Sequence, residues 1–168
     1  MAGMQFPQSA RATVKEETMG VIVVGVDHSD GAKTALGFAL EEARLRQAKL
    51  RAVNAWQFSY TGPGYVAGSY PVLGGELDDV RGAAEAGLDA TLREAIPDAG
   101  DVEIERRIVE GAAAAVLVEE SRGAELLVVG SRGHGGFAGL LLGSVSQQCA
   151  QHAECPVVIV RVSSAKSD

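Results

Sequence analysis

Two glycine-containing turns in the C-terminal part of the chain have the residue types of an anion-binding site. Gly130-Ser131-Arg132-Gly133 is separated by nine residues from Gly143-Ser144. Glycines allow a ligand to approach the backbone closely, and the free N–H groups at a helix N-terminus attract negative charge. Because the sequence predicts a helix from about Ser144, a small molecule that carries phosphate is the first functional hypothesis.

Side chains in the same turns add phosphate donors. Ser144 and Ser146 carry hydroxyl groups, and Arg132 offers a planar fork of N–H groups that matches phosphate oxygens. An isolated Gly-x-x-Gly more often only shapes a surface loop. Here a predicted strand precedes the first turn and Ser144 follows the second, so the pattern favours binding.

Two other phosphate loops fit less well. A Walker A loop needs Gly-x-x-x-x-Gly-Lys-Ser/Thr, and residues 139–143 have neither that spacing nor the lysine. Residues 133–138 match the dinucleotide pattern Gly-x-Gly-x-x-Ala formally. That pattern belongs in the turn that opens a nucleotide-binding half, whereas a single further strand is predicted here, so a dehydrogenase is not favoured.

The glycine turns belong to a chain in which predicted strands and helices alternate. Continuous apolar runs predict buried strands, and apolar residues at helical spacing predict the helices between them. The predicted strands are residues 21–26, 50–56, 102–109, 125–129 and 156–161; the first helix follows Ser29 or Asp30, and the others cover about 76–96, 112–122 and 144–152. This order predicts an α/β fold, a doubly wound five-stranded parallel sheet flanked by helices.

The predicted elements form one domain. We expect it to cover residues 20–162, with a flexible N-terminal tail at 1–19 and a C-terminal tail at 163–168. Asp27 and Gly130 lie at the predicted ends of the first and fourth strands. Ligands of such sheets bind at the carboxyl ends of the strands, so we expect both residues to lie in one crevice.

Composition argues against several classes of function. The sequence has 15 Lys and Arg against 22 Asp and Glu, a net charge of −7, and no basic run, which argues against nucleic-acid binding. The apolar stretches have strand length and no segment resembles a secretory signal, so we expect no membrane insertion. Cys149 and Cys155 make neither a disulfide framework nor a zinc site, and we expect a cytoplasmic protein.

Several conspicuous residues have ordinary interpretations. His28, His134 and His152 lack the spacing of metal ligands, so no protein-built metal site is expected. Cys149 is interpreted as a core residue, and Leu140–Leu142 as core packing rather than a cover for a ligand.

The pattern Gly130-x2-Gly133-x9-Gly143-Ser144 resembles the one that separates ATP-binding members of the universal stress protein family from members that do not bind ATP. Val24–Ser29 and Cys155–Val160 support this resemblance, which covers about residues 20–161. It implies a sandwich like that of the adenine-nucleotide alpha-hydrolases. It also implies an adenine nucleotide, ATP or else AMP or ADP, with Mg²⁺ that would come with the nucleotide phosphates.

The resemblance also implies which residues hold the adenosine part of the nucleotide. Asp27 would contact it, beside a wall shaped by Gly25 and Val26, and Ala55 would pack by the adenine. A carboxylate suits a ribose hydroxyl or the adenine amine better than a phosphate, because like charges repel. Asp27 also has the simpler interpretation of a turn or cap residue.

The phosphate end is implied in the same way. Val129 and Gly130 would border the ribose and phosphates, and Arg132 and Gly133 would meet the phosphates from the loop. The start of the last helix would cradle them with Gly143, Ser144, Val145 and Ser146.

Three functions remain open on the sequence alone: a nucleotide-dependent regulatory module in a stress response, a slow ATPase, and a dimeric interaction protein whose loop is vestigial. Residues 131–142 contain no carboxylate and no Walker lysine, so we assign no catalytic residue and expect at most weak hydrolysis. The resemblance implies a homodimer through the last strand, since an exposed edge at Val157–Val160 would favour association.

Overall fold

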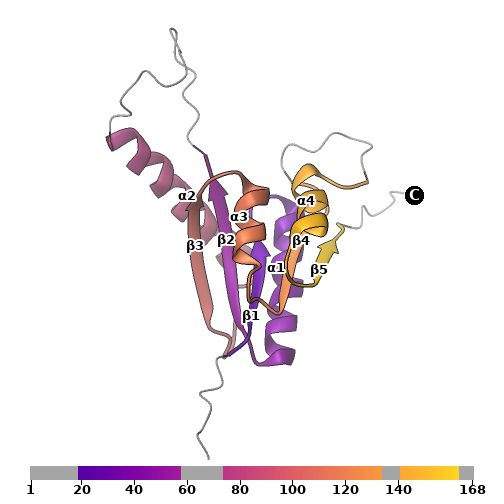
Figure 1. The fold of residues 1–168 in the computed structure, drawn as a ribbon. Helices are drawn as coiled ribbons and strands as arrows, with labels where there is room; N and C mark the ends of the chain where they lie inside the picture. The colour runs from indigo at the N-terminus through magenta and orange to yellow at the C-terminus, as the bar shows by residue number, and fades with distance from the viewer. Residues whose placement is uncertain (1–18, 58–73, 134–140, 163–168) are drawn as a thin grey trace, which may run out of the picture.

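The computed structural model describes residues 19–57, 74–133 and 141–162. In these ranges strands and helices alternate along the chain (Figure 1). The elements are β1 (Val21–Gly25), α1 (Asp30–Arg46), β2 (Lys49–Trp56), α2 (Gly74–Ala95), β3 (Ile104–Glu110), α3 (Ala113–Glu120), β4 (Leu126–Gly130), α4 (Ser144–His152) and β5 (Val157–Val160). The predicted α/β fold with a five-stranded parallel sheet is confirmed, whereas the two predicted tails lie outside the described residues, apart from Met19.

The strand order places two loops beside each other. All neighbouring strands are parallel, and their order in the sheet is β3-β2-β1-β4-β5. The chain therefore builds outward from β1 to β3 on one side and then resumes at β4 on the other. Val24 of β1 lies opposite Val128 of β4, so both strands end at the same level. This switch in strand order is where open α/β sheets bind ligands.

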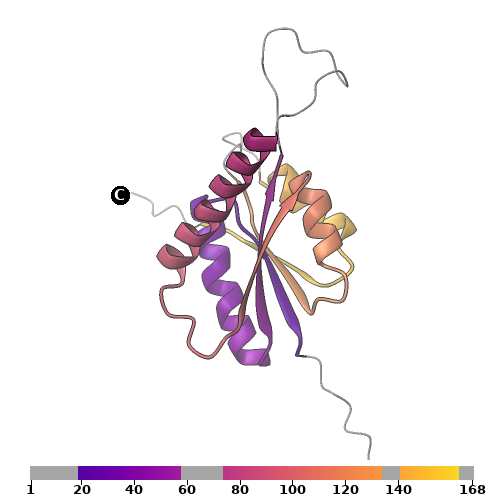
Figure 2. The same cartoon turned by 90° about the vertical axis from the view of Figure 1, so that its left-hand side faces the viewer.

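Helices cover both faces of the sheet. Seen along the sheet, α1 and α2 lie on one side of it and α3 and α4 on the other (Figure 2). The central strands are therefore buried on both faces, which explains why β1 and β4 are continuous apolar runs rather than alternating ones. Ile22 faces the α1 side and Val23 the opposite side, and both are fully buried.

The first helix, α1, has a capping residue at each end. Ser29 is the N-cap of α1, and its Oγ accepts a hydrogen bond of 3.1 Å from the Ala32 N–H. Of the two residues that the sequence left open, Ser29 rather than Asp30 is therefore the cap. The helix ends at Arg46, and its C-cap, Gln47, takes the left-handed conformation with a φ of 54°.

Some predicted boundaries are wrong by one or two residues. The strand β1 ends at Gly25 rather than Val26, although the Val26 N–H still donates to the Val53 carbonyl over 2.9 Å. The strand β3 begins at Ile104 because the Val102 N–H turns back to the Ala99 carbonyl over 3.3 Å. None of the helices in the described part of the chain combines the length and the hydropathy that a membrane span requires.

Burial of α1 against the sheet makes a direct prediction about stability. Leu36 is fully buried on α1, whereas Leu45 on the same helix is 78% exposed. Leu36→Ala is expected to lower the free energy of unfolding by about 2–5 kcal/mol, because it removes buried methyl groups and leaves a cavity. Leu45→Ala should change it by less than about 0.5 kcal/mol. Urea unfolding of both variants measures the difference; equal losses would contradict this packing.

Candidate functional site

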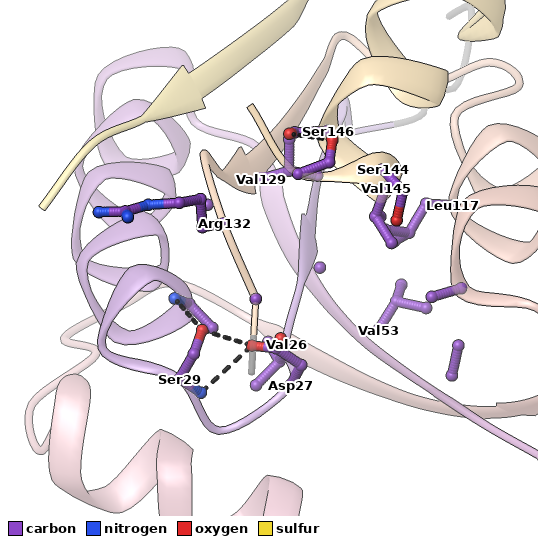
Figure 3. A pocket seen from close by; sticks show the side chains of 17 residues that line it. Val26, Asp27, Ser29, Val53, Leu117, Val129, Arg132, Ser144, Val145 and Ser146 are labelled. Carbon is purple, nitrogen blue, oxygen red and sulfur yellow. Dashed lines mark hydrogen bonds between the residues drawn. The ribbon is translucent and has the colours of Figure 1, made fainter. Parts of the chain in front are cut away.

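A cavity of about 450 Å³ lies at the carboxyl ends of β1, β2 and β4 (Figure 3). This volume is within the range of small-molecule sites. The residues that line it come from the ends of these strands, the glycine turns and the first turns of the helices. They are Gly25, Val26, Asp27, Ser29, Ala32, Val53, Ala55, Ala113, Leu117, Val129, Gly130, Arg132, Gly133, Gly143, Ser144, Val145 and Ser146.

The structure thus brings to one cavity all the residues that the resemblance implied. Sequence reasoning missed Ser29, Ala32, Val53, Ala113 and Leu117. Ser29 and Ala32 follow Asp27 closely enough that the helix they begin could have suggested them. Ala113 and Leu117 belong to α3, and no motif marks them. Only the packing of α3 over β2 brings them to the site.

Two glycines set how closely α1 approaches β4. An ideal Cβ on Gly130 would lie 2.9 Å from the carbonyl carbon of Gly31, and one on Gly31 would lie 2.8 Å from the Arg132 carbonyl oxygen. Real Cβ atoms essentially never come this close to backbone atoms. The first turn of α1 therefore packs backbone against backbone on the end of β4, which closes one side of the cavity.

Asp27 joins the turn after β1 to the glycine loop. Its Oδ1 accepts hydrogen bonds from the Ser29 N–H at 3.2 Å and the Ser29 hydroxyl at 2.6 Å. A Cβ on Gly133 would overlap Asp27 Oδ2. Asp27 is therefore a turn residue, which agrees with the simpler of its two interpretations. Its carboxylate also lines the cavity.

The N-terminus of α4 offers donors that no side chain in the described residues caps. Gly143 is the N-cap, with φ −77° and ψ 164°, and it makes no side-chain cap hydrogen bond. The first N–H groups of a helix have no partner within the helix, and the helix dipole makes this end partly positive. Of the other two helices at the cavity, α1 is already capped by Ser29 and begins with the acidic Asp30, whereas α3 has Ala112 as its N-cap and also makes no side-chain cap hydrogen bond. An anion is therefore favoured at α4 rather than at α1.

Ser131 holds the glycine turns together. Its carbonyl accepts hydrogen bonds from the Gly143 N–H at 2.7 Å and from the Ser146 hydroxyl at 3.0 Å. Its own N–H donates to the Val160 carbonyl of β5 over 2.7 Å. The buried Ser146 hydroxyl therefore hydrogen-bonds within the loop, whereas the Ser144 side chain is exposed at the N-terminus of α4.

The far end of the cavity is apolar. Val53 and Ala55 of β2 and Leu117 of α3 line it, whereas Val129 of β4 lies beside Ser146 of α4 (Figure 3). Leu117 fills the space that a side chain at Gly25 would need, because a Cβ there would lie 2.8 Å from Leu117 Cδ1. One end of the cavity thus suits a flat apolar group, and the α4 end suits an anion.

Three expectations about neighbouring residues have different outcomes. Arg132 extends over α1, away from the other lining side chains (Figure 3), and makes no hydrogen bond or ion pair with described residues. Cys149 of α4 is fully buried in the core, and burial raises the pKa of its thiol to about 11. Leu141 is 71% exposed, so the expectation of core packing is wrong there, whereas Leu140 and His134 lie outside the described residues.

The described residues hold no group of three or more His, Cys, Asp or Glu side chains that could bind a metal ion.

Comparison with known sequences identifies the relatives of this chain. The sequence profile of the universal stress protein family matches residues 19–161. The chain belongs to the universal stress protein family. A universal stress protein of Mycobacterium tuberculosis is 38% identical over 151 residues, which are 87% of this chain and 50% of that protein. One of Mycolicibacterium smegmatis is 36% identical over 143 residues, 83% of this chain and 45% of that protein.

This family member spans about half the length of the curated relatives it matches. Two solved structures of the family match this chain over nearly their whole length. A universal stress protein solved in complex with cAMP is 32% identical, with a TM-score of 0.53, and the match covers 85% of this chain and 97% of that one. UspA from Lactobacillus plantarum shares the fold with a TM-score of 0.69 at 24% identity, over 84% of this chain and 97% of that one.

The contact of α1 with β4 predicts opposite effects for two glycines of one helix. A Cβ on Gly37 would meet nothing within 4 Å, so Gly37→Ala is expected to raise the free energy of unfolding by about 0.5–1 kcal/mol through helix propensity. Gly31→Ala should lower it by about 1–3 kcal/mol, because the Arg132 carbonyl must move away. Thermal unfolding of both variants measures this. Stabilisation by both would show that the close contact is absent.

Proposed function

We propose that this chain binds an adenine nucleotide and acts as a nucleotide-dependent regulatory module. The observation that carries the proposal is the cavity at the switch point, apolar at one end and faced at the other by the uncapped N-terminus of α4. The family member solved with cAMP, at 32% identity, supports an adenine nucleotide as the ligand.

In this proposal the adenine ring occupies the apolar end, beside Ala55 and Leu117. The phosphates accept hydrogen bonds from the first N–H groups of α4, with the exposed Ser144 hydroxyl as a further donor. Asp27 lies on the other side of the cavity mouth, where its carboxylate accepts from a ribose hydroxyl and stays away from the phosphates. The resemblance of the glycine pattern supports ATP in particular, and Mg²⁺ would be held by the phosphates.

The same residues favour binding over hydrolysis. Asp27 is the one carboxylate among the lining residues that the structure describes, and its Oδ1 is engaged by Ser29. Efficient phosphoryl transfer needs a group that positions water and cations that stabilise the developing charge. A module whose nucleotide state selects its partners therefore fits this cavity better than an ATPase does.

Alanine substitutions at Asp27 and Gly133, with Asp30 as the control, test the proposed site. Asp27→Ala is expected to weaken AMP or ATP binding about tenfold, since it removes a charged acceptor at the ribose. Gly133→Ala should weaken binding similarly, because its Cβ displaces the Asp27 carboxylate. Asp30→Ala is the control, because Asp30 is exposed on the same turn but does not line the cavity.

Titration calorimetry measures these affinities, after any nucleotide that co-purifies has been released by denaturation and identified by mass. Absence of both co-purified nucleotide and binding heat in a folded protein would refute the proposal. The dimeric interaction protein would then be the better account.

We also propose that the chain forms a homodimer through β5. The two edges of the sheet differ, because β3 carries Glu105, Arg106 and Arg107, whereas β5 is Val-Val-Ile-Val. Charged residues on an edge strand prevent pairing with another chain, and an aliphatic edge favours it. Two copies of the chain would also have about the length of one of the curated relatives.

The ladder between β4 and β5 shows which backbone groups are free to pair. Leu127 N–H donates to the Pro156 carbonyl and Ser131 N–H to the Val160 carbonyl. Since a parallel strand alternates its bonding sides, the N–H of Ile159 faces away from β4. A partner strand would accept from it.

A proline at this position is expected to dissociate the dimer. Ile159→Pro removes the outward N–H and leaves the β4 ladder intact, so a monomer mass is expected at micromolar concentration. Ile159→Ala loses the same aliphatic side chain but keeps the N–H, and should remain dimeric. Light scattering across a dilution series distinguishes them; a monomeric parent protein would disprove the dimer.

A further inference from the structure

The turn between β1 and α1 contains a residue in an unfavourable backbone conformation. His28 has a φ of 67°, in the left-handed region that non-glycine residues rarely adopt. Its neighbours on either side are Asp27 and Ser29, which both line the cavity. Strain of this kind persists only where surrounding contacts hold the residue in place. Two contacts of the His28 ring are with α2.

The first contact is a hydrogen bond whose direction can be assigned. His28 Nδ1 lies 2.7 Å from Thr91 Oγ1. The Thr91 hydroxyl donates its one hydrogen to the Gly87 carbonyl over 2.9 Å. With its hydrogen on the Gly87 carbonyl, the Thr91 oxygen accepts from the ring in the tautomer that carries a hydrogen on Nδ1. The imidazole is thus held in one orientation by α2.

The second contact is with Gly87 of α2, where the missing side chain leaves a notch for the imidazole ring. A Cβ there would lie 2.7 Å from Cε1 and 2.8 Å from Nε2 of His28. Glycine inside a helix is unfavourable, and this one makes room for the ring. Gly82 of the same helix meets nothing within 4 Å, so the notch is specific to the position under His28.

We propose that His28 is a positioning residue that anchors the Asp27–Ser29 turn to α2. Asp27 bonds Ser29, and Ser29 caps α1 through Ala32, so the turn is one hydrogen-bonded unit with His28 at its centre. With the ring anchored, the Asp27 carboxylate stays over Gly133 and faces the cavity. None of the described side chains of α2 lines the cavity, yet the helix fixes the geometry of the residue that meets the ribose. This last step rests on the proposed function.

Two variants remove the anchor in different ways. Thr91→Val keeps the shape of the side chain but removes the acceptor for Nδ1. His28→Gly removes the ring and also relieves the left-handed strain, so its thermal midpoint is expected within about 5 °C of the parent. The matched control is Thr34→Val on α1, because Thr34 bonds the Asp30 carbonyl in the same way over 2.8 Å but does not touch His28.

The first measurement needs no ligand. Amide hydrogen exchange of Ala32, whose N–H donates to Ser29, should become about tenfold faster in Thr91→Val and His28→Gly than in Thr34→Val. Nitrogen NMR of the parent should show His28 with its hydrogen on Nδ1. Unchanged exchange in both anchor variants would overturn the inference whether or not the protein binds a nucleotide.

The second measurement uses AMP as the probe. Affinity should fall about three- to tenfold in both anchor variants and stay unchanged in Thr34→Val. In an Asp27→Ala background the same changes should have no further effect, because His28 acts through Asp27. Faster exchange with unaltered affinity would overturn the positioning role. If the parent binds no nucleotide at all, the proposed function fails, and the anchor of the turn is then judged by exchange alone.

Discussion

The contact between the backbones of Gly31 and Gly130 is the constraint on which the site depends. Parallel strands with helices on both faces bring the first turn of α1 toward the end of β4, but a side chain at either position would keep them apart. Because neither residue has one, the turn after β1 reaches the glycine loop, and Asp27 lies against Gly133. The cavity between them keeps its apolar end because Leu117 and Val53 are held by the core beneath.

The electrostatic character of the cavity depends on how α1 and α4 begin. Both α1 and α4 start at the carboxyl edge of the sheet, and both would attract an anion if left open. The Ser29 side chain accepts from an N–H group at the start of α1, and the charge of Asp30 partly neutralises the positive end of the α1 dipole. Gly143, in contrast, gives α4 no capping side chain. One end of the cavity is therefore positive and the opposite side carries the carboxylate of Asp27. A ligand with a phosphate at one end and hydroxyl groups further along matches this distribution.

Much of the architecture could be predicted from the sequence because its signals are local. Apolar runs such as Val21–Val24 and the cap at Ser29 predict elements without knowledge of their neighbours. The resemblance to the universal stress protein family, carried by the glycine spacing, implied twelve of the residues that line the cavity. The order of the strands in the sheet could not be predicted from these local signals, because the order depends on which helix covers which face. For the same reason Leu117 of α3 was missed, and the engagement of the Ser146 hydroxyl by Ser131 could not be foreseen.

Much of the cavity wall consists of main chain and of residues with little or no side chain. Gly25, Gly130, Gly133 and Gly143 line it together with Ala32, Ala55 and Ala113. Alanine scanning removes atoms, so at these positions it has nothing to remove and would pass over much of the wall. Added atoms are the informative perturbation here, and a scan that introduces methyl groups or larger side chains would map the wall. At these positions the site is therefore sensitive to the gain of a side chain, whereas at Asp27 it is sensitive to the loss of one.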